Sequence, residues 1–198
     1  LFFLSLLLSV NLLLAQTNDK GIFQQAMQIY EEEKYSLAQH LFNQVYTNKL
    51  STEVEREQSL FYLAICSKNL FNEDAEFWFD EFLDLYPYSS RINEVNYELA
   101  LFYFRQSVYE KAIYYFLRCD NNNNEFYFKT AYSYFMLDSL ESSKYYFGKL
   151  IGSESKYAAS STYFYAHIAY KQKHYKTALS NFLDLKEEKN FSVIIPYY

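Results

Sequence analysis

Apolar side chains recur every three or four positions along most of this 198-residue chain, which is the spacing of one face of an α-helix. In residues 92–106, for example, Leu99, Phe102 and Tyr103 fall on a common face. Polar stretches interrupt the pattern, and the clearest follow Pro87 and Gly152. Together they predict ten helices in five pairs: 19–32 with 35–46, 54–69 with 73–85, 92–106 with 109–118, 124–136 with 140–150, and 155–172 with 175–187.

One short block recurs five times, at or just before the start of the second helix of each pair. It places a small residue between two larger apolar ones, and it is looser in the second pair than elsewhere. The small residues stand 37, 37, 31 and 35 positions apart, which is the period of a stacked-repeat architecture. The five blocks are Tyr35-Ala38-Phe42, Phe71-Ala75-Phe79, Tyr109-Ala112-Phe116, Leu140-Ser143-Phe147 and Tyr175-Ala178-Phe182.

Small residues also recur in the first helix of each pair. Two helices can cross closely only where the side chains at the crossing are small, so these positions predict the packing of each hairpin. The two small residues of a pair stand 12 positions apart, except in the second pair, where the interval is 11. The predicted packing pairs are Ala26 with Ala38, Ala64 with Ala75, Ala100 with Ala112, Ala131 with Ser143, and Ala166 with Ala178.

This alternation of small and aromatic residues, with Pro87 closing one unit, resembles the tetratricopeptide-repeat family. The resemblance covers residues 19–188. It implies an all-α, right-handed solenoid with repeats at about 19–50, 54–88, 92–121, 124–152 and 155–188. The chain departs from the family pattern in three respects, one of which is that the second unit is out of step with the others. The tryptophan that often opens a unit is missing, and the turn glycine is replaced by Glu33, Ser107, Asp138 and Lys173.

In that family the first helices line a concave groove that binds peptides. Carried over to this chain, the resemblance implies a groove of aromatic residues, although several of these rings could instead simply pack against the neighbouring helix. Family members that clamp the terminal carboxylate of cytosolic chaperones use Lys and Asn here, so we exclude that function. The candidate groove residues are Phe23, Tyr30, Phe61, Tyr97, Phe104, Phe128, Tyr132, Phe135, Tyr163, His167 and Tyr170.

Composition narrows the picture further. The chain has only 3 Gly and 2 Pro but 23 Tyr and 19 Phe. So few turn-forming residues disfavour a β-sandwich or β-barrel, which needs many tight turns. The net charge of −6 argues against a nucleic-acid partner, since such proteins carry a clustered basic face. Cys66 and Cys119 stand far apart in apolar helices, and we expect them to be buried small hydrophobic residues.

The sequence contains no recognisable catalytic or metal-binding pattern. His40, His167 and His174 do not have the spacing of a metal site, and no glycine-rich phosphate loop occurs. No histidine stands near Cys66 in the sequence to activate its thiol. We therefore expect no enzyme activity, no catalytic residues and no cofactor.

The two ends of the chain suggest separate features. Residues 1–15 are uncharged and apolar, too short for a comfortable membrane span, and end in a small residue, which is typical of a secretory signal peptide cleaved after Ala15, with Gln16 as the mature start. A buried apolar helix is the alternative. Residues 191–198 look like the start of a further, truncated repeat.

Together these features predict a binding scaffold in the periplasm or cell envelope of a Gram-negative bacterium, with a protein or peptide partner. Membrane contact is expected only through residues 1–15 or a segment beyond this chain. The runner-up is the sensory ectodomain of a membrane-bound signalling protein such as a histidine kinase, which would need an apolar stretch of about 20 residues further on. A third hypothesis is a secreted enzyme whose catalytic domain follows this chain.

Overall fold

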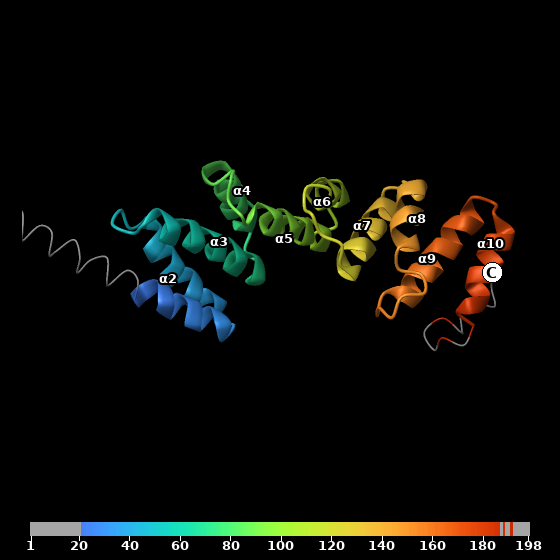
Figure 1. Ribbon diagram of the computed structural model, residues 1–198, viewed down its shortest axis with the longest axis horizontal. Coiled ribbons are helices and arrows are strands. Elements are labelled where there is room, and N and C mark those ends of the chain that lie inside the picture. Colours follow the sequence, from blue (N-terminus) through green and yellow to red (C-terminus); the bar gives the residue numbers. More distant parts are fainter. Residues whose placement is uncertain (1–20, 187, 189–190, 192–198) are drawn as a thin grey trace, which may run out of the picture. The chain divides into compact units, whose positions relative to one another are not determined.

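A computed structural model describes residues 21–186, 188 and 191, so the expected signal peptide and residues 192–198 lie outside the described part. The described residues are helical, with no strand among them, which confirms the predicted all-α class. Residues 21–31 form the first helix (Figure 1). The following helices are α2 (Tyr35–Thr47), α3 (Glu53–Asn69), α4 (Ala75–Leu85), α5 (Ile92–Arg105), α6 (Tyr109–Phe116), α7 (Asn124–Met136), α8 (Leu140–Gly148), α9 (Ala158–Lys171) and α10 (Tyr175–Asp184).

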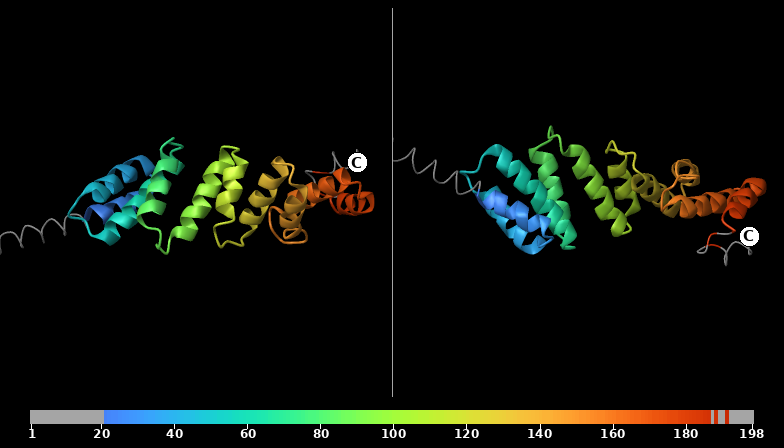
Figure 2. Two further views of the ribbon diagram at one scale, coloured as in Figure 1. Left: turned by 90° about the horizontal axis from the view of Figure 1, so that it is seen from above. Right: turned by 60° about the horizontal axis from the view of Figure 1, so that its bottom comes forward.

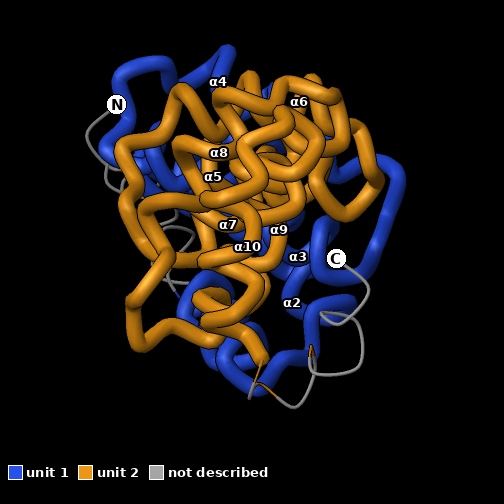
Figure 3. The backbone as a smooth tube through the Cα atoms, turned by 90° about the vertical axis from the view of Figure 1, so that its right-hand side faces the viewer, with its two compact units in different colours: residues 1–95 blue, residues 96–198 orange. Residues whose placement is uncertain are grey.

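The chain divides into two compact units within α5 (Figure 3). Unit 1 ends at Val95 and holds the first helix, α2, α3 and α4. Unit 2 begins at Asn96 and holds most of α5 and the helices from α6 to α10. Within each unit, consecutive helices pair as antiparallel hairpins, which Figure 1 shows most clearly for α7 with α8 and for α9 with α10, and Figure 2 shows the same ribbon from two further sides.

Each hairpin turns through one residue with a positive φ. At Asp138, for example, the amide donates to the carbonyl of Phe135 at 3.0 Å, and the next amide, of Ser139, donates to Tyr134 at 2.9 Å. This pair of bonds ends the helix in the left-handed conformation that glycine usually supplies. The five residues are Glu33 (58°), Phe71 (60°), Ser107 (61°), Asp138 (54°) and Lys173 (63°).

The small residues lie where the two helices of a hairpin cross. All ten are buried, with at most 2% of their surface exposed. Ser143, the single non-alanine, donates its hydroxyl to the carbonyl of Ala131 across the hairpin at 2.9 Å, so its polar group is satisfied inside the core. One turn further along each second helix, a phenylalanine fills the interior with no more than 3% exposure; these are Phe42, Phe79, Phe116, Phe147 and Phe182.

The second hairpin differs from the other four, as the shorter interval between its two small residues predicts. In all five hairpins the left-handed residue follows the buried alanine of the first helix by seven positions. The small residue of the second helix then follows after five positions in four hairpins but after four in this one, so its turn is one residue shorter. Phe71 therefore lies in the turn, 76% exposed, rather than at the packing position that Tyr35 occupies in the first hairpin.

Candidate binding face of the first helices

The residues proposed for the groove lie on the first helices of the hairpins, but few of them are open to solvent. Phe61 is buried, with 2% of its surface exposed. Tyr170 is exposed at 45%, and the other nine are half-buried. Because each of these rings contacts another ring of its own or a neighbouring hairpin, they contribute to packing as well as to the surface.

In unit 2 the rings form a connected cluster centred on Tyr132 of α7. Its ring lies 5.8 Å from that of Phe104 on α5 and 5.6 Å from that of Phe164 on α9. Phe128 and Phe135, one turn to either side on α7, lie 6.4 Å and 6.5 Å from it. These distances are those of favourable stacked and edge-to-face pairs, so side chains from three successive first helices hold one another in fixed positions.

The cluster continues along α9 through His167. The imidazole lies 5.9 Å from the ring of Phe135 and 6.2 Å from that of Tyr163. Burial lowers the pKa of His167 below its usual value, and the ammonium group of Lys171 lowers it further. The imidazole is therefore neutral at pH 7 and adds a flat polar group to an otherwise apolar face.

The charges beside this face are paired. Lys129 of α7 bonds to Glu125 at 3.0 Å and lies over the ring of Phe104, 5.0 Å from its centroid. Lys171 of α9 bonds to Asp138 at 2.7 Å. Each ammonium group is balanced by a carboxylate, so this face offers rings and isolated polar groups rather than a cluster of cations for an anionic ligand.

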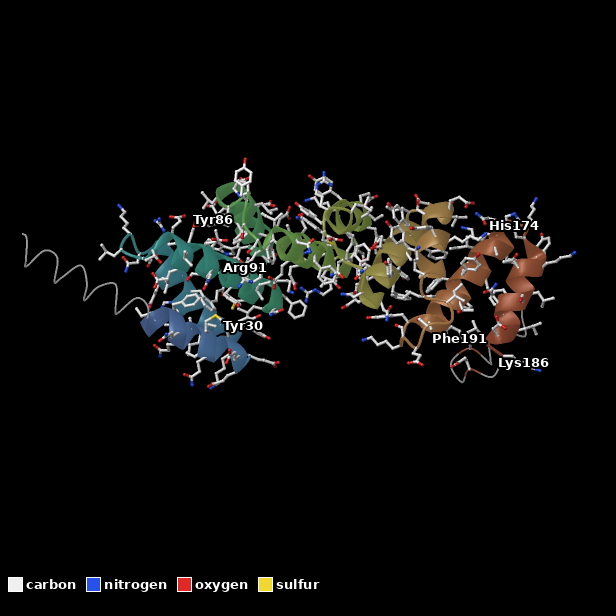
Figure 4. All side chains as sticks on the ribbon, in the orientation of Figure 1. Tyr30, Tyr86, Arg91, His174, Lys186 and Phe191 are labelled. Carbon is white, nitrogen blue, oxygen red and sulfur yellow. The ribbon has the colours of Figure 1, made fainter. Side chains whose placement is uncertain are left out.

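Unit 1 carries a smaller patch of the same kind. Tyr30 of the first helix meets Tyr62 of α3 edge to face at 5.0 Å. The guanidinium group of Arg91 lies 4.2 Å from the centroid of the Phe61 ring and 5.4 Å from that of Tyr62, a cation–π arrangement (Figure 4 labels Tyr30 and Arg91). The sequence reasoning missed Arg91, Tyr62 and Phe164. Tyr62 and Phe164 share one signal, since each stands two positions before the buried alanine of its first helix. Arg91 stands nine positions before Ala100, as Tyr157 does before Ala166.

A hollow of about 470 Å³ in unit 1 is lined by Tyr46, Thr47, Glu53, Arg56, Leu85 and Tyr86. There Arg56 pairs with Glu53, and Tyr46 donates to Glu81 at 3.2 Å, so these polar groups pair within the chain.

Possible metal ligands and thiols were located among the described residues. No group of three or more His, Cys, Asp and Glu among them could hold a metal ion. Burial raises the pKa of the Cys66 thiol to about 12 and that of Cys119 to about 11, which makes both poor nucleophiles at neutral pH. In the same residues, no helix is both long and apolar enough to cross a membrane.

Comparison with known proteins agrees with the fold. No model of a protein family and no curated protein matches the chain. Among solved structures, MamA AMB-1 is 16% identical, with a TM-score of 0.71 over 90% of this chain and 98% of that one. A Podospora anserina protein described as a kinesin light chain with nearly identical TPR-like repeats is 13% identical, with a TM-score of 0.56 over 86% of this chain and 96% of that one. The chain has the fold of a tetratricopeptide-type repeat protein, as its sequence predicts.

Proposed function

We propose that this chain is a non-enzymatic scaffold that holds a protein or peptide partner on the aromatic face of its first helices in unit 2. The observation that carries the proposal is the connected ring cluster around Tyr132, which joins α5, α7 and α9. Rings already held in place lose little freedom on binding, and aromatic side chains dominate the energy of many protein interfaces. Arrays of this fold present extended surfaces of this kind.

The chemistry of the face defines the partner. Since Lys129 and Lys171 are each bonded to a carboxylate, a segment rich in acidic groups would gain little here. An extended or helical segment with apolar and aromatic side chains fits better, with the neutral His167 and the tyrosine hydroxyls as hydrogen-bond partners. The net charge of −6 also favours a protein over a nucleic acid.

We place this scaffold in the periplasm or cell envelope of a Gram-negative bacterium. The support is the uncharged apolar stretch of residues 1–15, followed at once by polar residues. Fractionation of cells, with N-terminal sequencing of the protein recovered, tests this part separately. A mature chain that begins at Gln16 in the envelope fraction is the expected result, and an unprocessed cytosolic chain would contradict it.

The binding proposal is tested by affinity capture from the envelope fraction with two matched variants. His167→Glu adds a charge to the aromatic face, whereas Tyr145→Glu adds the same charge to α8, at a tyrosine that is 60% exposed. Capture of the partner should be lost in His167→Glu and retained in Tyr145→Glu, with equal helicity in both. Equal capture by the two variants would contradict a role for this face.

A further inference from the structure

Charge is divided unevenly between the two units of this chain. Residues 21–95 carry 13 acidic and 5 basic side chains, whereas residues 96–186 carry 8 acidic and 11 basic ones. The acidic excess is concentrated around α4, since residues 69–90 contain six Asp and Glu but no Lys or Arg. The reverse holds around α10, since residues 157–183 contain three lysines but no Asp or Glu. Each unit therefore contains one helix whose surroundings carry a single sign of charge.

The acidic stretch also exposes large apolar side chains. On α4, Phe77 is 56% exposed and shares a helix face with Asp84, seven positions on, which is exposed as well. Glu73 is exposed just before the helix, and Tyr88, which follows it, is 99% exposed. We call these four residues the acidic face. Exposed apolar groups with charged groups around them are typical of surfaces that bind another protein.

The outer side of α10 has the opposite charge. Tyr175, Leu179 and Leu183 follow one another at intervals of four positions, and all three are more than half exposed. Lys173 and Lys176 are exposed at the start of this helix, beside a hollow of about 570 Å³ whose lining includes both lysines and Tyr175. We call these five residues the basic face. It combines an apolar stripe with cationic groups at one end.

We propose that the acidic face of one copy of this chain docks on the basic face of a second copy. The two faces match in apolar character and are opposite in charge, which are the properties of complementary protein surfaces. The exposed ring of Tyr88 fits the hollow beside Lys173 and Lys176, because an ammonium group is attracted to the face of a tyrosine ring. Glu73 and Asp84 supply the carboxylates that balance the lysines.

This contact joins two different surfaces, so every pair of copies keeps one unused face of each kind. Such a head-to-tail contact adds further copies until a ring closes or a filament forms, whereas contact between two identical faces stops at a dimer. Two basic faces, or two acidic faces, would repel each other at close range. We therefore expect a series of species that grows with concentration rather than a single dimer.

Analytical ultracentrifugation of the full chain over a range of concentrations measures this association. The average mass should rise with concentration. Raising the salt from about 0.05 M to about 0.5 M should increase the protein concentration needed for the same average mass by about tenfold, because salt screens exposed charges. A monomer at every concentration would overturn the proposal, and so would association that salt leaves unchanged.

Charge reversal on the basic face tests which surface is used. The variant Lys173→Glu with Lys176→Glu should be monomeric, because its α10 would then meet an acidic face with the same sign of charge. Glutamate is compatible with the fold at both positions, since the equivalent residues of other hairpins are Glu33 and Glu110. The matched control is Lys149→Glu with Lys156→Glu, which makes the same change of charge at two exposed lysines outside both faces and should associate like the wild type.

Charge reversal on the acidic face separates head-to-tail contact from a symmetric dimer. The variant Glu73→Lys with Asp84→Lys should also be monomeric alone, although its basic face is intact. An equimolar mixture of this variant with the reversed α10 variant should associate again, because each reversed face then meets its complement. Persistent association of the reversed α4 variant alone would indicate contact between two copies of α10 and overturn the proposal. A mixture that stays monomeric would overturn it as well.

Discussion

Replacing Tyr132 by alanine tests whether the aromatic face is also part of the structure. Its half-buried ring contacts five others, more than any other candidate groove residue shows among the described contacts. Truncation of a fully buried aromatic residue costs about 3–5 kcal/mol, and a ring of intermediate burial should cost roughly half to two-thirds of that. We therefore expect Tyr132→Ala to lower the free energy of unfolding by about 2–3 kcal/mol. The five partner rings are those of Phe104, Tyr109, Phe128, Phe135 and Phe164.

Thermal unfolding followed by circular dichroism at the helical band measures this loss. For a chain of this length, each kcal/mol lowers the melting temperature by about 2–4 °C, so a decrease of roughly 4–12 °C is expected. Tyr132→Phe keeps the ring contacts and should stay close to the wild type. Tyr145→Ala removes a tyrosine that is 60% exposed and should change the stability by less than about 0.5 kcal/mol.

If Tyr132→Ala and Tyr145→Ala had equal melting temperatures, the packing described for α5, α7 and α9 would be refuted. A large loss of stability in Tyr132→Ala would also affect the measurement of partner binding with that variant. Weaker partner capture by that variant would reflect unfolding as well as lost contacts. Charge addition at His167 is therefore the cleaner test of the face.

Further predictions concern the crossing, the last turn of α8 and pH. Ala112→Leu overpacks a fully buried crossing and should cost about 1–3 kcal/mol in urea unfolding; a neutral result would contradict the close approach of α5 and α6. Gly148→Ala should stabilise the chain by up to about 1 kcal/mol, because alanine favours the helix and the new Cβ would lie 3.7 Å from Tyr165, an ordinary van der Waals contact. A loss of stability in this variant would show that α8 and α9 pack more closely than this distance allows. Because burial holds the pKa of His167 below its unfolded value of 6.5, the unfolded chain binds its proton first as the pH falls. The free energy of unfolding should decrease on acidification from pH 7 through 6.5, and less so in His167→Phe; an identical pH dependence in both would contradict the burial of this ring.

The period and the fold class could be predicted from the sequence because the crossings accept only small side chains. This restriction recurs in every hairpin, so Ala100 with Ala112 and Ala131 with Ser143 stand at the same interval. Helix ends could be placed only within a few residues. The helix expected at 155 begins at Ala158, because the amide of Tyr157 bonds to the side chain of Ser155 and holds that segment in a turn.

The shorter turn and the exposure of the rings were harder to predict. The resemblance placed Glu33, Ser107, Asp138 and Lys173 at the turn glycine of the family, and all four have a positive φ. It missed Phe71, the fifth such residue, because the turn of the second hairpin is one residue shorter. Whether a ring such as Phe135 or Tyr170 is covered depends on the next hairpin, which local sequence does not specify. For the same reason, sequence alone left open whether the rings bind a partner or pack.

Site-specific photo-cross-linking measures the central claim, partner binding on the aromatic face of unit 2, most directly. A benzoyl-phenylalanine placed at His167 on α9 should cross-link to the captured partner, and the same group at Tyr145 on α8 should not. Cross-links from position 145 alone would assign binding to the second helices and contradict the account.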